Sequence, residues 1–393
     1  MSRDLLELVF RETIHQLNPA AVTAQAIAAA NIEEFVTLIA AGKAAASMTR
    51  GALSVLGERV FDGCIVVPHE LNRPMPMTVL VATHPTPSAA SVRAGEALLA
   101  AVASGRRVVA LISGGASALA CVPAPGVSLA DKLEVTGAVM RAGAPIEKLN
   151  TVRKHLSAIK GGQLAEAATA PVTTFALSDV VGDRLTDIAS GPTVPDPTSR
   201  DDARCIIEQF APEHASISSS LVATPKVARQ SDSALVIAGT GTLIDTAVEV
   251  ARGNGLDTAV GARDLTGDVT HVADQLAAIQ RTGCVVAGGE PTIALPTSPG
   301  TGGRAHHLAL LIAQRIRGQT NTHVLVAGSD GIDGNTDAAG AIVDGTTWQR
   351  VADPESALAT ANAGSALAAI GASLVTGPTG VNHADLIVML RTN

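Results

Sequence analysis

The sequence predicts an α/β protein of two domains. Its 393 residues exceed the roughly 100–200 residues of one typical domain. Short apolar runs alternate with segments of helical periodicity, a pattern typical of a mainly parallel, doubly wound sheet with helices on both faces. Hydrophobic residues make up 47% of the chain and charged residues 16%, so we expect a packed core. Because only 2% of the residues are aromatic, Ala, Val, Leu and Ile must fill that core.

The first part of the chain is predicted to alternate helices and strands. Residues 5–16 and 20–29 have helical character, and the apolar run 35–40 is expected to be a buried strand. Further strands are predicted at 65–67, 79–82, 108–112 and 172–177, and helices at 129–140 and 149–159.

The predicted domain boundary lies in segment 218–233, which is rich in Ser, Thr, Pro, Lys and Arg and has no clear period. We therefore expect domains at residues 1–230 and 231–393. In the second domain, strands are predicted at 234–238, 258–260, 284–287, 324–327 and 386–390, and helices at 243–252, 269–279 and 303–316.

The composition argues against several classes of function. A formal net charge of −8 gives no long-range attraction to nucleic acid or anionic lipid, and few aromatic side chains are available to stack on bases. The N-terminus has early acidic residues and no apolar signal core, and no run reaches the roughly 18 apolar residues of a membrane span. The four cysteines form no Cys-x-x-Cys pair, which argues against a zinc site or a disulfide framework. A cytoplasmic enzyme is the expected class.

A Ser/Gly-rich turn follows the predicted strand 108–112. In open α/β sheets, ligands bind beyond the carboxyl ends of the strands. Ser113, Gly114, Gly115 and Ser117 would present backbone N–H groups and hydroxyls to an anion there, so they are candidate phosphate-binding residues. A plain tight turn is the alternative interpretation.

Two single charged residues also follow predicted strands. Lys43 comes after the strand 35–40 at the start of an Ala-rich helix, where a cation is unfavourable unless an anion is nearby. It is not part of a Walker A motif, because Ala44 stands where Ser or Thr is required. Asp179 follows the strand 172–177, a usual place for a catalytic carboxylate, although a turn cap is equally compatible.

A second glycine-rich segment, 300–304, precedes a predicted helix. Arg304 would lie at the helix start, where the macrodipole disfavours a cation, and this indicates an anionic ligand beside Gly302, Gly303 and Arg304. The same residues fit the G-x-G-x-x-A dinucleotide fingerprint of a nicotinamide-dependent reductase. Against that alternative, two prolines separate the segment from the preceding strand, and no acidic residue follows at the required spacing of about 20 residues.

Three aspartates crowd the loop 329–337 after the predicted strand 324–327. A cation would relieve their mutual repulsion, so Asp330 and Asp333 are candidate Mg²⁺ ligands together with substrate phosphates. An EF-hand does not fit, since Ala338 would stand at the position of the sharp-turn Gly. A solvated acidic loop with Asx turns is the alternative.

The predicted helix 149–159 has basic residues away from its apolar stripe. Arg153 and Lys154 are candidate substrate-binding cations, and a solvated basic face is the alternative. Lys160, at the predicted helix end, is explained by the helix dipole alone.

In their order along the chain, these motifs resemble the glycerate 2-kinases that combine a Rossmann-like N-terminal domain, DUF4147, with a C-terminal MOFRL domain. The likeness runs nearly end to end. It includes residues 42–44, 84–87, 113–119, 150–162, 177–183, 188–193, 288–292, 300–304, 330–341 and 376–382.

The resemblance implies transfer of the ATP γ-phosphoryl group to D-glycerate, usually at its 2-hydroxyl, with Mg²⁺ or a similar divalent ion. It also implies an active site in the cleft between the two domains, with Lys43 and Arg304 as its basic residues. A positioned Arg contributes roughly 10³–10⁵ in rate to phosphoryl transfer. Some relatives have been labelled hydroxypyruvate reductases, so an NAD(P)H-dependent reductase stays an alternative, as does a kinase of a related hydroxy acid.

Two departures from the family pattern stand near the expected site. Where the family continues the Arg with Asn-Gln-Glu, this chain has Ala305-His306-His307, so an amide and a carboxylate are lost. Ser88 replaces the Asp that ends the HPxPD turn. The first departure is expected to affect substrate choice, metal use or activity, and an inactive ligand-binding homologue is a further alternative.

The candidate residues combine into one hypothesis. The Ser/Gly turn would bind the phosphates of MgATP, with Lys43 and Arg304 on the transferring group. Asp179 or Asp333 would hold the metal or orient the substrate hydroxyl, and Arg153 would bind the substrate carboxylate. The expected partners are therefore a nucleotide and a small molecule, with no nucleic acid and no membrane. A homodimer is compatible with the sequence.

Overall fold

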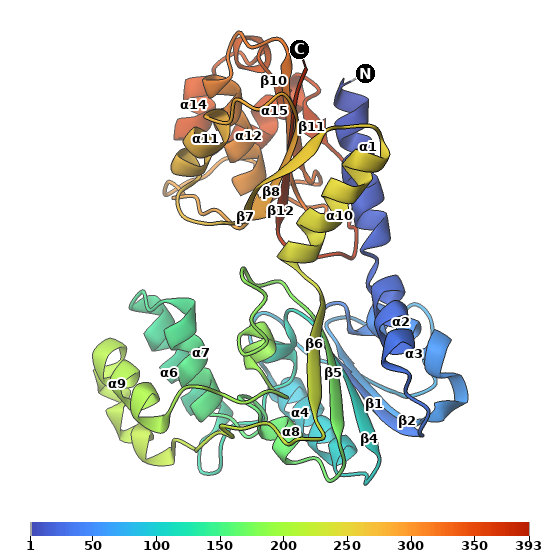
Figure 1. Cartoon of the computed structure of the whole chain (residues 1–393). Coiled ribbons are helices and arrows are strands. Elements are labelled where there is room, and N and C mark those ends of the chain that lie inside the picture. Colours follow the sequence, from blue (N-terminus) through green and yellow to red (C-terminus); the bar gives the residue numbers. More distant parts are fainter. Residues whose placement is uncertain (1, 393) are drawn as a thin grey trace. The chain divides into compact units, whose positions relative to one another are not determined.

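The computed structural model describes residues 2–392, which form two compact units (Figure 1). The N-terminal unit comprises Pro19–Ser178 and Asp183–Ile237. The C-terminal unit comprises the chain up to Asn18, the short stretch Asp179–Gly182, and the chain from Ala238 on. These units differ from the predicted domains 1–230 and 231–393. The chain up to Asn18 belongs to the C-terminal unit, and the N-terminal unit extends to Ile237.

The N-terminal unit is built on a six-stranded sheet with the order β3-β2-β1-β4-β5-β6. Its strands are β1 (Val36–Ala41), β2 (Val60–Val67), β3 (Thr78–Val81), β4 (Arg107–Ile112), β5 (Val172–Leu177) and β6 (Ser233–Ala238). All neighbouring pairs from β3 to β5 are parallel. This is the strand order of a Rossmann-type sheet, and such sheets bind ligands where the order reverses, here beyond the carboxyl ends of β1 and β4.

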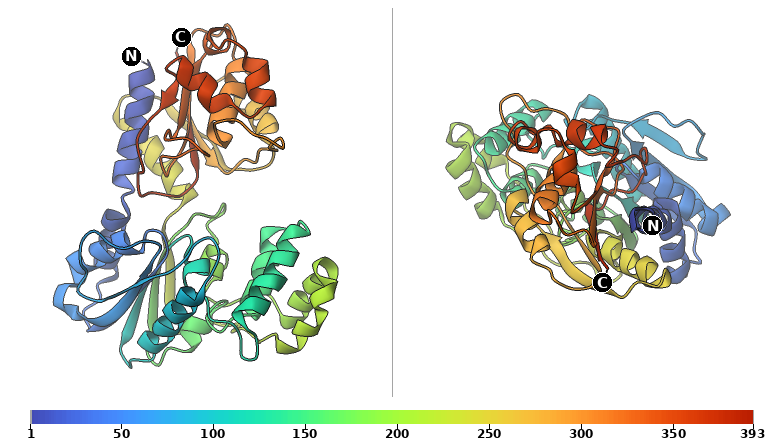
Figure 2. Two further views of the ribbon diagram at one scale, coloured as in Figure 1. Left: turned by 180° about the vertical axis from the view of Figure 1, so that it is seen from behind. Right: turned by 90° about the horizontal axis from the view of Figure 1, so that it is seen from above.

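Helices cover both faces of this sheet (Figures 1 and 2). On one face α3 (Ala45–Leu56) packs on β1, β2 and β4, with α2 (Pro19–Ala30) against it; on the other α4 (Ala89–Val102) packs on β1, β2 and β3. Strands β1 and β5 are buried along their whole length, as a sheet covered on both sides requires. The short helices α5 (Ala116–Leu119) and α8 (Gln163–Glu166) complete this part of the unit.

A group of helices with its own apolar core is attached to the N-terminal unit. It contains α6 (Leu129–Arg141), α7 (Ile146–His155) and α9 (Arg200–Phe210). Val139, Val152, Leu156 and Ile207 lie at the centre of this core, each less than 1% exposed. Short 3₁₀ segments lie at Gly57–Arg59, Ile188–Ser190 and Pro212–Ser220.

The C-terminal unit has a mixed sheet with the order β11-β10-β9-β12-β8-β7. Its strands are β7 (Thr258–Leu265), β8 (Gly283–Gly289), β9 (Thr322–Gly328), β10 (Gly340–Asp344), β11 (Ser373–Leu374) and β12 (Asp385–Arg391). Strands β7 and β8 are parallel, whereas β12 runs antiparallel to both β8 and β9, and β10 runs antiparallel to β9 and β11. The last strand of the chain is therefore central in this sheet.

Helices also cover both faces of the C-terminal sheet. Helices α1 (Ser2–Gln16) and α10 (Thr240–Gly253) pack together on one face, and α1 contacts β9 and β12. The other helices are α11 (Val269–Ala277), α12 (Arg304–Arg315), α13 (Thr347–Arg350), α14 (Pro354–Ala359) and α15 (Ala363–Ala369). Their core includes Leu308, Ile312 and Trp348, the single tryptophan of the chain. None of the helices formed by residues 2–392 combines the length and the apolar character that a bilayer span demands.

Candidate active site

Lys43 and the Ser/Gly turn after β4 lie together at the carboxyl ends of β1 and β4. The Lys43 backbone N–H donates to the Gly114 carbonyl at 2.9 Å, and the Ala44 N–H donates to Ser113 Oγ at 3.1 Å. Gly42 permits this close approach, since a Cβ at that position would overlap the Ser113 hydroxyl. The structure thus brings together two segments that the sequence analysis proposed as separate candidates. Their binding of phosphate stays a prediction.

The Lys43 side chain is exposed at this edge of the sheet. A Cβ on Gly115 would lie 3.2 Å from both Lys43 Cγ and His84 Cδ2, so all three groups border the same space. None of the ion pairs formed among residues 2–392 involves Lys43. Burial and the neighbouring Lys43 charge both lower the pKa of His84 below its ordinary value. A cation in this position is available to an anionic ligand.

The sequence analysis placed Lys160 at the end of a helix. In the structure α7 ends at His155, so Lys160 lies beyond the helix. The Lys160 side chain is buried, and its Nζ donates to the Ser117 carbonyl at 2.7 Å and to Ser117 Oγ at 2.8 Å. Burial lowers the pKa of Lys160 to about 7. Ser117 is therefore held by a second lysine that sequence reasoning did not connect with the Ser/Gly turn.

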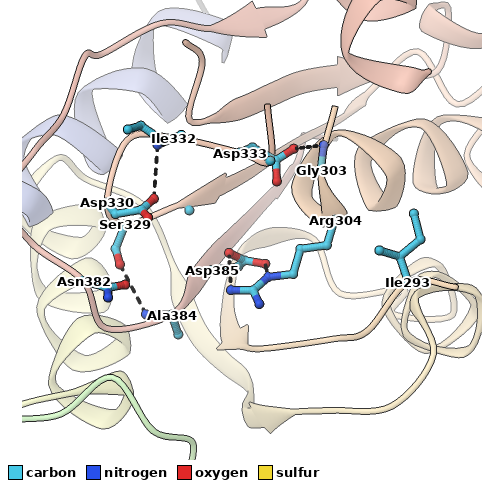
Figure 3. A pocket seen from close by; sticks show the side chains of 12 residues that line it. Ile293, Gly303, Arg304, Ser329, Asp330, Ile332, Asp333, Asn382, Ala384 and Asp385 are labelled. Atoms are coloured by element: carbon cyan, nitrogen blue, oxygen red, sulfur yellow. Dashed lines mark hydrogen bonds and ion pairs between the residues drawn. The ribbon is translucent and has the colours of Figure 1, made fainter. Parts of the chain in front are cut away.

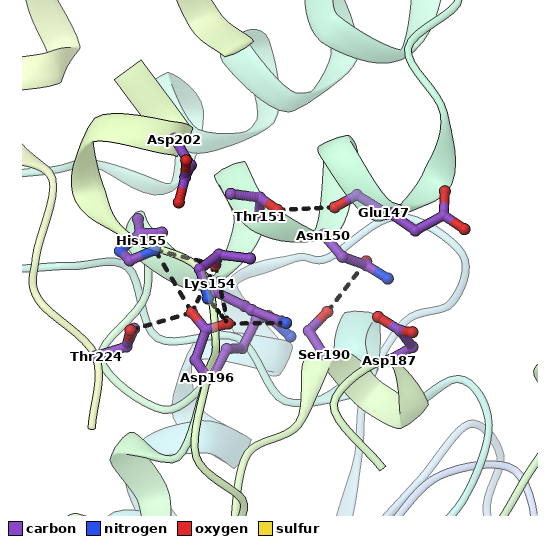
Figure 4. Close-up of polar contacts among 12 residues, drawn as sticks. Glu147, Asn150, Thr151, Lys154, His155, Asp187, Ser190, Asp196, Asp202 and Thr224 are labelled. Carbon is purple, nitrogen blue, oxygen red and sulfur yellow. Dashed lines mark hydrogen bonds and ion pairs between the residues drawn. The ribbon is translucent and has the colours of Figure 1, made fainter. Parts of the chain in front are cut away.

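Lys154 and Arg153, the two predicted substrate-binding cations, have different surroundings, and Figure 4 shows those of Lys154. Lys154 is buried and forms an ion pair with Asp196 at 3.1 Å; Asp196 is itself 1% exposed and also accepts from Thr224. Burial opposes ionisation of Asp196, but hydrogen bonds from Thr198 and the charge of Lys154 lower its pKa. Lys154 thus has a structural counter-ion and no open position for a substrate.

Of the two predicted substrate-binding cations, Arg153 is the more accessible to a ligand. It is half-buried, and its Nη1 donates to Asn150 Oδ1 at 3.4 Å. Burial lowers the pKa of Arg153. Its substrate-binding role stays a prediction.

In the C-terminal unit, Arg304 is the first residue of α12 and is held by two carboxylates, of which Figure 3 shows Asp385. Its Nε lies 2.6 Å from Asp385 Oδ2 and its Nη2 lies 3.2 Å from Asp385 Oδ1, while Glu290 Oε1 is 2.8 Å from Nη2. Burial acts against the charge of Arg304, but Asp385 and Glu290 raise its pKa, so it stays a cation. Burial raises the pKa of Asp385 to about 6 although Arg304 acts to lower it. The sequence analysis expected an anionic ligand beside Arg304. In this structure the carboxylates of Asp385 and Glu290 occupy that place.

Asp333 caps the N-terminus of α12. Its carboxylate accepts hydrogen bonds from the backbone N–H groups of Gly303, Ala305 and His306 at 2.8–3.0 Å, and from His306 Nδ1 at 2.5 Å. A carboxylate has about four lone-pair sites, and these four bonds use them. Asp333 therefore has no lone pair left for a metal ion, which argues against its predicted role as a metal ligand. Its carboxylate also occupies the helix N-terminus, where the sequence led us to expect an external anion.

The backbone donors of the 300–304 segment are similarly occupied. The Gly302 N–H donates to Asn335 Oδ1 at 2.8 Å, and the Gly303 N–H donates to Asp333. Strand β8 ends at Gly289, well before α12 begins at Arg304, so the segment is not the tight strand-to-helix turn of a dinucleotide fingerprint. Cofactor binding by Gly302 and Gly303 would have to displace these side chains.

A pocket of about 270 Å³ opens beside Arg304, and Asp330 borders it. Asp330 Oδ1 accepts from the Ile332 N–H at 3.1 Å, which is an Asx-type turn. A Cβ on Gly328 would lie 3.1 Å from Asp330 Oδ1 and 3.5 Å from Asp385 Oδ1, so both carboxylates flank this glycine. Residues 2–392 contain no group of three or more His, Cys, Asp or Glu side chains that could hold a metal ion. A Mg²⁺ ion would therefore depend on phosphate and water ligands, with Asp330 as the better protein candidate of the predicted pair.

Asp179 is half-buried beyond the end of β5, in the short stretch that groups with the C-terminal unit. Its catalytic role stays a prediction. Asp385, Glu290 and Lys160 are site residues that sequence reasoning did not identify. Glu290 lay within a recognised motif, whereas Asp385 lay in a strand and had no local signal.

These observations define a class of protein: a two-unit α/β chain with an exposed lysine against a Ser/Gly turn in a Rossmann-ordered unit, and a carboxylate-held arginine at a helix start in the other. Residues 5–223 match the family model described as "Domain of unknown function (DUF4147)", and residues 283–385 match the MOFRL family model.

Curated relatives and a solved structure agree with these matches. The D-glycerate 2-kinase of Thermotoga maritima is 34% identical over 97% of this chain and 96% of its own length, and the glycerate 2-kinase of Pyrococcus horikoshii is 33% identical over 91% and 88%. A putative hydroxypyruvate reductase of Agrobacterium vitis is 34% identical over 90% and 86%. The crystal structure of glycerate kinase from Thermotoga maritima superposes with a TM-score of 0.92 at 32% identity, covering 99% of each chain.

This chain belongs to the glycerate 2-kinase family with DUF4147 and MOFRL domains. The predicted family and α/β fold class are confirmed. The hydroxypyruvate reductase name occurs among relatives of the same family, as the resemblance implied.

Proposed function

We propose that this chain transfers the γ-phosphoryl group of ATP to the 2-hydroxyl of D-glycerate in the cytoplasm, with Mg²⁺ entering on the nucleotide. Family membership supports a glycerate kinase. The observation that supports it most directly within the chain is the exposed Lys43 beside the 113–117 turn, at the point of a Rossmann-ordered sheet where ligands bind.

Each candidate group has a role in this proposal. Lys43 neutralises charge on the phosphates, and Ser113 and Ser117 donate hydrogen bonds to them. Arg304, fixed by Asp385 and Glu290, stabilises the charge that develops on the transferring group. Phosphoryl transfer depends chiefly on such positioning and charge neutralisation. Bound Mg²⁺ would supply further charge neutralisation, with Asp330 as a protein ligand.

The activity is tested with purified protein, D-glycerate, ATP and Mg²⁺. ADP release should depend on all three additions, and phosphorus NMR of the product should show 2-phosphoglycerate. Oxidation of NADH by hydroxypyruvate without ATP would replace the proposal with a reductase. Absence of both activities would indicate an inactive binding protein, the outcome anticipated for the Ala305-His306-His307 departure.

Two variants test the site. Lys43→Met and Arg304→Ala should each lower kcat/KM at least about 100-fold, the effect of removing one positioned charge or donor. Lys148→Met is a matched control, because Lys148 is a half-buried lysine on α7 whose Nζ contacts only Gln209 and the Phe210 ring among residues 2–392. A loss below threefold in either site variant would remove that residue from the chemistry.

A further inference from the structure

A continuous chain of hydrogen bonds connects two cations of the N-terminal unit. Lys160 Nζ donates to Ser117 Oγ at 2.8 Å, and Ser117 Oγ lies 3.1 Å from Ser190 Oγ. Ser190 Oγ donates to Asn150 Oδ1 at 3.3 Å, a contact drawn in Figure 4. Arg153 Nη1 donates to the same Asn150 oxygen at 3.4 Å. Three separate parts of the chain thus contribute to one polar network.

The donors of this network have a fixed direction. An ammonium and a guanidinium can only donate, so Lys160 occupies a lone pair of Ser117, and Arg153 requires that Asn150 present its oxygen. Ser190 uses its proton on that oxygen. Ser117 must therefore donate its own proton, and in this structure the acceptor is Ser190. Because Lys160 donates to the Ser117 oxygen, the O–H group of Ser117 must point away from Lys160.

The network lies in an excess of positive charge. Lys132 and Arg153 are cations that act against the charge of Lys160, and none of the ion pairs formed among residues 2–392 joins Lys160 to a carboxylate. Lys132 is buried as well, and its Nζ donates to the Leu156 carbonyl at 2.8 Å. Buried cations without a carboxylate partner are unfavourable, and a bound anion would relieve this imbalance.

Exposure separates the residues that can touch a ligand from those that cannot. Lys160 is 2% exposed, and Ser190 is 1% exposed. Ser117 and Arg153 are only half-buried. A ligand can therefore contact Ser117 and Arg153, whereas Lys160 can influence it only through Ser117.

We propose that Lys160 is a positioning residue for an anionic oxygen of the reactants. By holding the Ser117 oxygen, it makes the Ser117 hydroxyl donate to a bound carboxylate or phosphate oxygen in place of Ser190, with Arg153 as a second donor to the same anion. The inference rests on the proposed function for the identity of that anion, which is either the D-glycerate carboxylate or an ATP phosphate.

Equilibrium binding, measured by calorimetry without turnover, tests this proposal. D-glycerate and ATP are titrated separately into the wild type, Ser117→Ala, Lys160→Met and the double variant. Each single variant should bind one ligand at least about 10-fold more weakly, as expected for a lost hydrogen bond to a charged group. The double variant should bind no more weakly than Ser117→Ala, because Lys160 acts through Ser117. The weakened ligand identifies the anion as carboxylate or phosphate.

Two further variants guard against a merely structural effect. Lys132→Met removes another buried lysine of this positive cluster that does not contact Ser117, so any loss of affinity should be smaller than that of Lys160→Met. Ser190→Ala removes the resting acceptor of the Ser117 proton, so its affinity should equal or exceed that of the wild type. This second variant keeps the proposal testable if Lys160→Met fails to fold.

The pH dependence of binding provides an independent readout. Because burial lowers the pKa of Lys160 to about 7, wild-type affinity should fall as the pH rises from about 6 to 8.5. A neutral amine accepts hydrogen bonds, so it would turn the Ser117 proton inward. Lys160→Met should show a smaller dependence on pH.

Several results would overturn the proposal: additive losses in the double variant, unchanged binding in Lys160→Met, an equal loss in Lys132→Met, or weaker binding in Ser190→Ala. A wild type that binds as described but transfers no phosphoryl group would refute the proposed function and leave this inference standing. A wild type that transfers phosphoryl groups while Lys160→Met binds normally would refute the inference alone. A wild type that binds neither ligand would refute both.

Discussion

Replacing Asp333 by Asn distinguishes a helix cap from a metal ligand. The carboxylate accepts from three backbone N–H groups and from His306, whereas an Asn side chain would turn its NH₂ group toward some of these donors. Losing one or two hydrogen bonds to a charged group, at about 1.5–3 kcal/mol each, should lower the free energy of unfolding of the C-terminal unit by about 1.5–6 kcal/mol. The effect should appear without any ligand or metal.

Urea unfolding followed by Trp348 fluorescence measures this loss. Trp348 is the only tryptophan and lies in the core of the C-terminal unit, so its emission reports on that unit. Asp330→Asn is the matched control, because Asp330 accepts from Ile332 in a half-exposed loop, and its loss should be about 1 kcal/mol or less. A loss below about 0.5 kcal/mol in Asp333→Asn, together with a higher Mg²⁺ requirement, would refute the cap and restore the metal ligand.

The Asp333 cap should also depend on pH with a definite sign. Burial opposes ionisation, but the hydrogen bonds from His306 and the helix N–H groups lower the pKa of Asp333 below its ordinary value of 3.8. The stabilisation is therefore complete above the unfolded pKa and is lost as the pH falls through the lower folded value. In Asp333→Asn this part of the acid dependence should disappear.

Three other substitutions or conditions test the N-terminal unit. Lys154→Met should lower the free energy of unfolding by about 3–5 kcal/mol, since Asp196 is left buried and unpaired, with KM for glycerate unchanged; a raised KM at normal stability would make Lys154 a substrate ligand after all. Gly42→Ala should reduce both stability and kcat/KM, because its methyl group would overlap the Ser/Gly turn, and a fully active, stable variant would contradict the packing described. Burial lowers the pKa of Lys132 to about 8 and of Lys160 to about 7, so the folded state binds fewer protons than the unfolded state up to the ordinary value of 10.5. Stability measured by circular dichroism should therefore rise between pH 7.5 and 9.5, by up to about 1.4 kcal/mol per pH unit for each lysine, and a decline would contradict the assignment.

Much of the N-terminal sheet could be predicted because its strands are short apolar runs between helical segments. The predicted strands 108–112 and 172–177 match β4 (Arg107–Ile112) and β5 within one residue. The strand 234–238 was predicted correctly as an element but assigned to the wrong unit, since it lies beside β5 as β6. An apolar run shows that a strand exists, and it does not show which sheet the strand joins.

The candidate site was only partly predictable for a related reason. Parallel strands place their carboxyl ends at one edge, so Lys43 and the Ser/Gly turn were sound candidates for neighbours. The conflict between Arg304 and the helix dipole was also detected, but its resolution by Asp385 depends on β12 lying between β8 and β9. Lys160 was misinterpreted because the predicted helix 149–159 continued beyond His155, where α7 ends. Long-range pairing and the exact end of a helix decide these contacts, and neither has a local sequence signal.

The placement of α1 affects how the protein folds during synthesis. Its apolar residues Leu6, Val9, Phe10 and Ile14 are buried in the C-terminal unit, on elements that begin with Thr240 and end with Arg391. Helix α1 precedes all of these elements in the chain, so its apolar side cannot be fully covered until β12 has been synthesised. The N-terminal unit, complete at Ile237, can fold well before that moment. During that interval the apolar side of α1 has none of its packing partners in the C-terminal unit.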